Sequence, residues 1–194
     1  MPILGVIASQ ISGHLSTTAF DSIATVTTTA GQTAVTFNNI PSTYKHLQVR
    51  GIGRANESNP GDGSGIYMRF NNDTASNYWY QRLYCVRGST NNNGTGDYSA
   101  NTNYPDCGII TSASQPASIY GGCIIDILDY ANTNIKHSAS VQSGFATTST
   151  STNQYTHTGA FAHNSTSAVS RIDLIVGTGS FAANSTFALY GVKG

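Results

Sequence analysis

Hydrophobic and polar side chains alternate along several short stretches of the chain. Between residues 44 and 53, Leu47 and Val49 share one face of an extended backbone, and Gln48 and Arg50 share the other. A period of two, with β-branched and aromatic residues, predicts a β-strand. The same signal, weak in the first segment, predicts further strands at 20–29, 34–37, 66–70, 78–86, 119–130, 136–145, 154–163, 172–176 and 187–192.

Turn signals, not helices, separate the predicted strands. Segments 56–65 and 71–73 are rich in Asn, Asp and Gly, and no stretch shows a convincing amphipathic helix of about ten residues. Short strands joined by turns predict an all-β fold, an antiparallel β-sandwich of jelly-roll type. We expect the last two strands, 172–176 and 187–192, to form a hairpin or an adjacent pair that closes the sandwich.

The first 15 residues, MPILGVIASQISGHL, are apolar and lack the positively charged start of a signal peptide. We interpret residues 1–19 as an extended N-terminal arm for anchoring or assembly, and residues 20–194 as the β-sandwich domain. The arm is expected to pack on its own domain, on a neighbouring subunit or on a host structure, because an exposed apolar segment favours association. Its apolar contact residues are Pro2, Ile3, Leu4, Val6, Ile7, Ile11 and Leu15.

The segment from Arg87 to Asp106 shows no hydrophobic period. It reads RGSTNNNGTGDYSANTNYPD and is dominated by Asn, Gly and Tyr. We predict a long loop or protrusion, a kind of segment that is usually functional or disordered when it exceeds about 12–15 residues.

Charge is scarce in this sequence. Charged residues make up 9% of the chain and the formal net charge is zero. A surface of uncharged polar residues favours association and suits a protein that works inside a large assembly. The few scattered basic residues argue against a nucleic-acid partner. No apolar run approaches the ~20 residues of a membrane helix, so we expect no membrane partner.

Catalytic and metal-binding motifs are not recognisable. The sequence has no GxSxG, HExxH or phosphate-loop pattern, and we expect its histidines to face solvent from strands. Arg171 and Asp173 are two residues apart and are expected to form an ion pair. The three cysteines, Cys85, Cys107 and Cys123, lack CxxC spacing and are interpreted as free thiols. We therefore predict no enzyme activity, no metal and no cofactor.

The positive chemical signal is a set of aromatic rings beside amide side chains. Trp79 lies between two tyrosines, and Tyr98, Asn101 and Tyr104 lie in the Asn-rich segment. Aromatic rings cover the apolar faces of sugars while amides match hydroxyl groups, which suits a receptor or glycan site. The same residues suit a subunit interface. The remaining alternative is that Trp79 or its tyrosine neighbours belong to the core or to ordinary surface.

Several segments resemble a group of small structural proteins of the tailed-bacteriophage virion, whose modules also occur in tail-fibre proteins. The similar segments are FDSIAT (20–25), TFNNIP (36–41), STYKHLQVRGIGR (42–54), RFNND (69–73) and the terminal FALYGVKG (187–194). The start of the chain is similar to theirs as well. The resemblance covers most of the chain except 87–106.

The resemblance implies a β-sandwich, assembly without catalysis and, often, trimers. On this basis we expect a virion protein: a capsid decoration or fibre protein, or a small tail-fibre component, anchored by the arm. Its partners would be itself, as a homotrimer, and other capsid or tail proteins. The alternative is a host-attachment adhesin that binds a host receptor or surface glycan. The recurring FALYGVKG end implies that the last strand is central to the fold.

Overall fold

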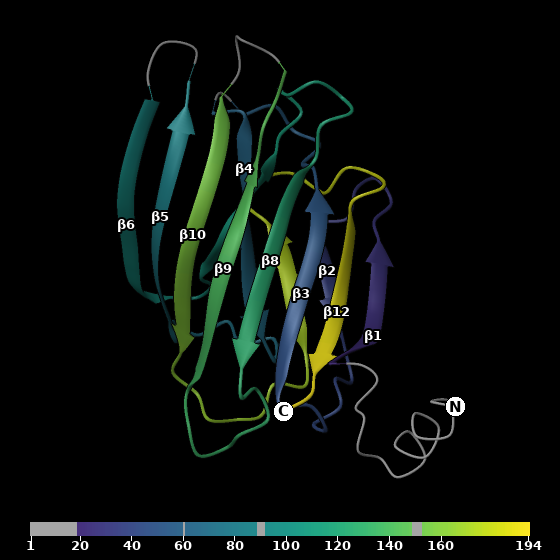
Figure 1. Cartoon of the computed structure of the whole chain (residues 1–194), viewed down its shortest axis with the longest axis vertical. Coiled ribbons are helices and arrows are strands. Elements are labelled where there is room, and N and C mark those ends of the chain that lie inside the picture. The colour runs from purple at the N-terminus through teal and green to yellow at the C-terminus, as the bar shows by residue number, and fades with distance from the viewer. Residues whose placement is uncertain (1–18, 60, 89–91, 149–152) are drawn as a thin grey trace, which may run out of the picture.

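The computed structural model describes residues 19–59, 61–88, 92–148 and 153–194, and within them the regular elements are all β-strands (Figure 1). The twelve strands are β1 (Phe20–Thr27), β2 (Ala34–Phe37), β3 (His46–Gly53), β4 (Gly63–Phe70), β5 (Tyr78–Arg87), β6 (Asn92–Thr102), β7 (Asp106–Thr111), β8 (Gly121–Leu128), β9 (His137–Phe145), β10 (Gln154–His163), β11 (Ile172–Val176) and β12 (Thr186–Val192). The predicted all-β class is confirmed.

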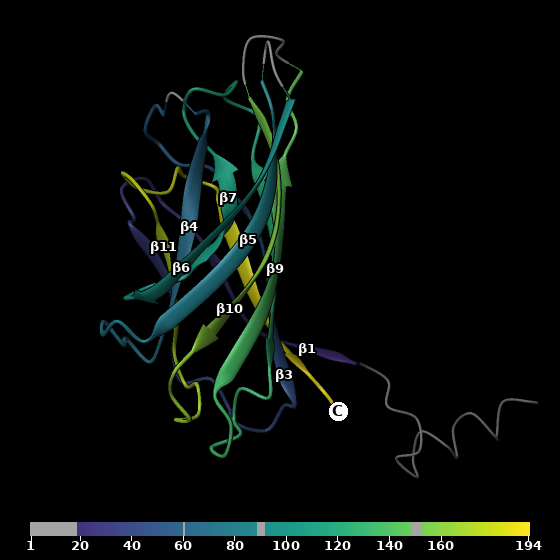
Figure 2. The same ribbon diagram turned by 90° about the vertical axis from the view of Figure 1, so that its left-hand side faces the viewer.

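The strands form two antiparallel sheets that pack as a sandwich (Figure 2). The large sheet has eight strands in the order β1-β12-β3-β8-β9-β10-β5-β6, and the small sheet has four in the order β2-β11-β4-β7. Two hairpins, β5–β6 and β9–β10, extend the large sheet on one side. Without them, each sheet has four strands, β1-β12-β3-β8 and β2-β11-β4-β7, and most successive strands along the chain change sheets.

The hydrophobic core fills the space between the sheets. Leu47 and Val49, the predicted inner face of β3, are fully buried, and so are the alternate residues Ile66, Met68 and Phe70 of β4. A side chain of this size contributes about 1.5–3 kcal/mol when it is removed from water. Alternation in the sequence therefore identified the inner faces of these two strands.

The final strand lies in the interior of the large sheet, between β1 and β3. The expectation that it is central to the fold is confirmed, but the expected pairing of the last two strands is wrong. β11 belongs to the small sheet and β12 to the large one. The connection between them crosses the sandwich, where buried Phe181 packs its ring 5.2 Å from the ring of Phe187. Because the connection carries the buried Phe181 into the core, it passes from one sheet to the other. A hairpin loop would stay on one sheet.

The prediction of a long loop at 87–106 is also wrong. Residues 92–102 form β6, the edge strand of the large sheet, in an antiparallel ladder with β5 that pairs Tyr84 with Thr95 and Arg82 with Asp97. Much of β6 is exposed, so backbone hydrogen bonds hold it and no apolar period is required. Pro105 then leads into β7, a short buried strand without alternation.

Phe187 and Gly51 are neighbours on β12 and β3, and this pair allows a test of the core. A Cβ atom added at Gly51 would lie 2.2 Å from Cδ1 of Phe187. We expect Phe187→Ala to cost about 3–5 kcal/mol of unfolding free energy, and Gly51→Ala about 1–3 kcal/mol because it overpacks the ring. In urea denaturation, the double variant should lose less unfolding free energy than the sum of the two single losses, because removing the ring also removes the overpacking. Strict additivity would contradict this contact.

Candidate functional site

The exposed apolar side chains gather on one face of the molecule. We call the side of the large sheet that is turned away from the small sheet the outer face. Seven large hydrophobic side chains are exposed in the described residues, and strand alternation places six of them on the outer face. They are Phe20, Ile52, Leu83, Tyr98, Ile124 and Leu128. Exposed apolar side chains that gather on one face favour an interaction site there.

Two hollows lie next to each other on the outer face, and we call them together the trough. The first, of about 950 Å³, crosses β12, β3, β8, β9 and β10. The second, of about 510 Å³, lies over β9, β10, β5 and β6. Thr156 and Thr158 of β10 line the first hollow, and Ala160 and Ala162 of the same strand line the second. The hollows therefore lie end to end along β10, and small side chains such as Thr158, Ala160 and Ala162 form part of their floor.

One charged side chain that lines the trough, Arg50, is held by contacts within the protein. The Arg50 guanidinium lies 5.3 Å from the ring centroid of Phe20 and 5.8 Å from that of Tyr190. Its Nε donates a hydrogen bond to Gln48, whose Nε2 donates to Oδ1 of Asp126 over 2.6 Å. Arg50 is exposed and lines the first hollow, so the trough offers a ligand a largely uncharged surface with one cation at this end.

The structure brings together two of the four aromatic and amide residues predicted from the sequence. Trp79 and Tyr98 both line the second hollow, and Tyr98 is 77% exposed. Asn101 is exposed near the end of β6, in a left-handed backbone conformation, and does not line this hollow. Tyr104 instead packs on Tyr67 of the small sheet, with ring centroids 4.4 Å apart. Trp79 points to the outer face and lies outside the core.

The seven arm residues predicted as assembly contacts lie outside the described residues. Pro2, Ile3, Leu4, Val6, Ile7, Ile11 and Leu15 therefore remain a prediction from the sequence.

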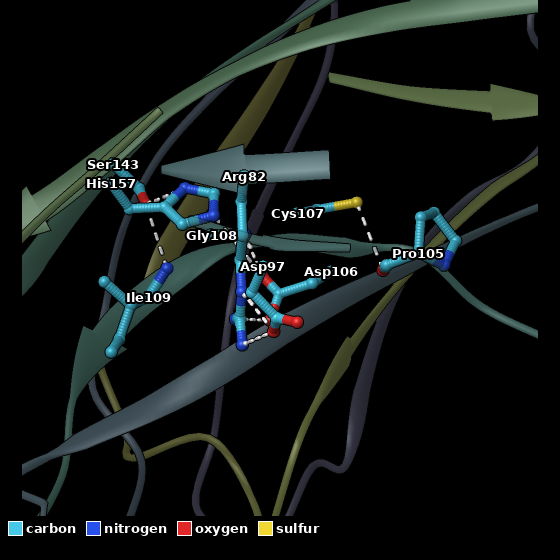
Figure 3. Close-up of polar contacts among 9 residues, drawn as sticks. All are labelled: Arg82, Asp97, Pro105, Asp106, Cys107, Gly108, Ile109, Ser143 and His157. Carbon is cyan, nitrogen blue, oxygen red and sulfur yellow. Dashed lines mark hydrogen bonds and ion pairs between the residues drawn. The ribbon is translucent and has the colours of Figure 1, made fainter. Parts of the chain in front are cut away.

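A polar cluster lies between the sheets, under the strands that extend the large sheet (Figure 3). Arg82 of β5 pairs with Asp97 of β6, at 2.8 Å from Nη2 to Oδ2, and with Asp106 of β7. The other carboxylate oxygen of Asp106 is 3.7 Å from Nε2 of His157 on β10. Nδ1 of His157 is 3.3 Å from Oγ of Ser143 on β9. The cluster thus connects five strands of the two sheets.

The cluster contains a serine, a histidine and an aspartate, but their arrangement differs from that of a hydrolytic triad. In such triads the serine contacts Nε2 and the aspartate Nδ1 of the histidine, whereas Ser143 contacts Nδ1 and Asp106 faces Nε2. Oγ of Ser143 also accepts a hydrogen bond from the Ile109 amide over 2.9 Å. His157 and Asp106 are both buried. These contacts support a structural role that joins β7 to the large sheet.

The expectation that the strand histidines face solvent is wrong for His137, His157 and His163, which are all buried. His163 stacks on the ring of Tyr78 at a centroid distance of 4.4 Å and bonds to Asp73 at 2.9 Å through Nε2. Loss of solvation, with a contribution from Arg82, lowers the pKa of His157 to about 4. Burial also lowers the pKa of His137. Residue type alone carried no signal of this burial.

Other predicted features have mixed outcomes. Arg171 and Asp173 form the expected ion pair at 2.8 Å, although Asp173 is buried. All three cysteines are free thiols, with Cys85 exposed and Cys107 and Cys123 buried. Across the described residues, no group of three or more His, Cys, Asp or Glu side chains is placed to hold a metal ion.

No helix in the described part of the chain is both long and apolar enough to cross a membrane. Comparison with protein-family models, with curated proteins and with solved structures gave no match. Functional inference therefore depends on the geometry of the molecule and on the sequence resemblance.

The buried histidines predict a loss of stability in acid. A folded pKa below the unfolded value means that the unfolded chain binds more protons, so stability falls as pH drops from about 6.5 through the folded pKa. For His157 the loss amounts to about 3 kcal/mol near pH 4, and His137 adds to it. Asp106 opposes part of this loss, because desolvation raises its pKa.

Urea denaturation at pH 7 and pH 4.5 measures this effect. His157→Asn keeps an acceptor for Ser143 but cannot take up the proton, so it should flatten the pH dependence. An equal slope in wild type and variant would contradict the assignment.

Proposed function

We propose that this chain is a non-enzymatic structural protein of a bacteriophage virion that associates through its outer face. In this proposal it is a jelly-roll β-sandwich, forms homotrimers and serves as a capsid decoration or fibre protein or as a small tail-fibre component. The observation that carries the proposal is the trough, where exposed apolar side chains gather on one face of a sandwich with few charges. An assembled particle would bury this face.

The strand order supports the jelly-roll part of the proposal. Without the two hairpins, the sheets β1-β12-β3-β8 and β2-β11-β4-β7 have the interleaved order expected of two packed Greek keys. The β5–β6 and β9–β10 hairpins widen the outer face from four strands to eight. The resemblance of segments such as 42–54 and 187–194 to virion proteins supports the location.

The polar cluster supports a role without catalysis. Its serine hydroxyl accepts a backbone hydrogen bond, and its histidine and Asp106 lie between the sheets. A catalytic group must be able to touch substrate, and the sequence offers no other nucleophile motif. The chemistry of the outer face, by contrast, suits binding.

Proteomics of purified particles tests the proposal. Virions of the phage that encodes this chain, banded in a density gradient, should contain the protein at a fixed copy number. Hundreds of copies per particle would place it on the shell, and roughly six to eighteen on the tail. Its absence from intact particles, when it is abundant in the infected cell, would refute the virion role.

A host-attachment role is the second candidate, and Trp79 and Tyr98 favour it. Both rings line the second hollow beside Gln81 and Ser138, a combination of aromatic and hydrogen-bonding groups that suits a neutral sugar. We expect Trp79→Ala to weaken glycan binding by about 3–10-fold. Leu83→Ala is the control, since Leu83 is exposed on the same strand but does not line the hollow.

Binding of both variants to host surface polysaccharide should be compared by isothermal titration calorimetry or a glycan array. If Trp79→Ala and Leu83→Ala bind as wild type does, the hollow is not a glycan site.

A further inference from the structure

The occupant of the trough can be inferred from the chain itself. We infer that the trough of one copy binds the apolar N-terminal segment, residues 2–15, of a second copy. This inference rests on the proposed assembly function and names the contact that would produce it. It depends on three features of the molecule: the character of the two surfaces, the place where the segment joins the domain, and the length of the segment.

The two surfaces are complementary in size and charge. Residues 1–18 contain no Asp, Glu, Lys or Arg, and the segment carries Ile3, Leu4, Val6 and Ile7 close together. The trough floor includes small residues of β9, β10 and β12, such as Ser138, Ala160 and Ala188, which leave room for aliphatic side chains. The segment brings no charged side chain to the contact and the first hollow of the trough brings one, Arg50, so burial of apolar area would drive the contact.

The segment joins the domain on the side of the outer face. Figure 2 shows the N-terminal end of β1 projecting from the large sheet on this side. The β1–β12 ladder holds the chain there through a hydrogen bond of 3.1 Å from the Lys193 amide to the Ala19 carbonyl. Directly beside it, Phe20 stacks on Arg50, and Arg50 and Tyr190 line the near end of the first hollow. The segment therefore leaves the domain on the face that, in this inference, a second copy covers.

The length of the segment is sufficient for this contact. Eighteen residues precede the described part of the chain, and at about 3.3 Å per residue they span up to ~60 Å. Eight strands spaced about 4.8 Å apart make the large sheet ~34 Å wide. A segment longer than the sheet is wide can cross to a second molecule. Because segment and trough are different surfaces, the contact is heterologous and can close into a ring, such as a trimer.

A complementation experiment with full-length variants tests the inference. The double substitution Leu4→Asp/Ile7→Asp places two charges in the apolar segment and leaves the trough unchanged. Thr158→Lys places a long charged side chain in the trough and leaves the segment unchanged. Thr166→Lys places the same new side chain on an exposed loop and is the matched control. Size-exclusion chromatography with light scattering over a range of concentrations reports the mass of each species, and thermal melting confirms that each variant is folded.

Wild type and Thr166→Lys should associate, and each of the other two variants alone should associate at least ten times more weakly. An equimolar mixture of these two should form a heterodimer, because one supplies the segment and the other the trough. If Thr158→Lys proves unfolded, Ala160→Lys in the second hollow replaces it.

Three results would overturn the inference. They are a wild type that stays monomeric at all concentrations, as expected if the segment binds its own trough; a Thr158→Lys variant that associates as wild type does; and a mixture that stays monomeric. Presence of the protein in virions is measured separately. If the protein is found in the particle but the segment and trough variants associate as wild type does, this contact is refuted and the virion role stands.

Discussion

The large sheet has twice as many strands as the sheet that covers it, and this mismatch shapes the rest of the structure. The small sheet covers the inner faces of β12, β3 and β8 with an apolar core that includes Leu47, Ile125 and Phe187. Its edge strand β7 reaches β9 and β10. Beyond that edge, the space under the large sheet holds a polar cluster of Arg82, Asp97, Asp106 and His157 in place of apolar side chains. The charges of this cluster are paired, and paired charges are less costly to bury than isolated ones.

The same mismatch leaves an eight-stranded outer face with no layer of its own. A soluble sheet usually makes such a face uniformly polar, yet Ile52, Ile124 and Leu83 are exposed here beside a trough with a small-residue floor. Few charged side chains line the trough, and most of the large hydrophobic side chains that are exposed in the described residues lie on this side. A partner that covers the outer face would explain these features together. This is the physical basis for the proposal that the protein assembles through this face.

Alternation in the sequence was sufficient to predict the all-β class and the inner faces of strands such as β3, since one side of these strands meets the core. It failed for β6, because an exposed edge strand held by backbone bonds has no apolar side to reveal it. Long-range geometry was equally hidden: Trp79 and Tyr98 meet through the β5–β6 ladder, while Tyr104 turns toward Tyr67. The burial of His157 depends on partners up to 75 positions away in sequence, as with Arg82 on β5.

In the proposed assembly the outer face becomes covered, and a native thiol reports on this directly. Cys85 is exposed on β5 and pairs with Thr156, which lines the trough. Cys107 and Cys123 are buried, and burial raises the pKa of both thiols, so they should stay unreactive in the folded protein. The rate of Cys85 alkylation, measured from dilute to concentrated protein, should fall in step with association. A rate that stays constant while the protein assembles would contradict the account.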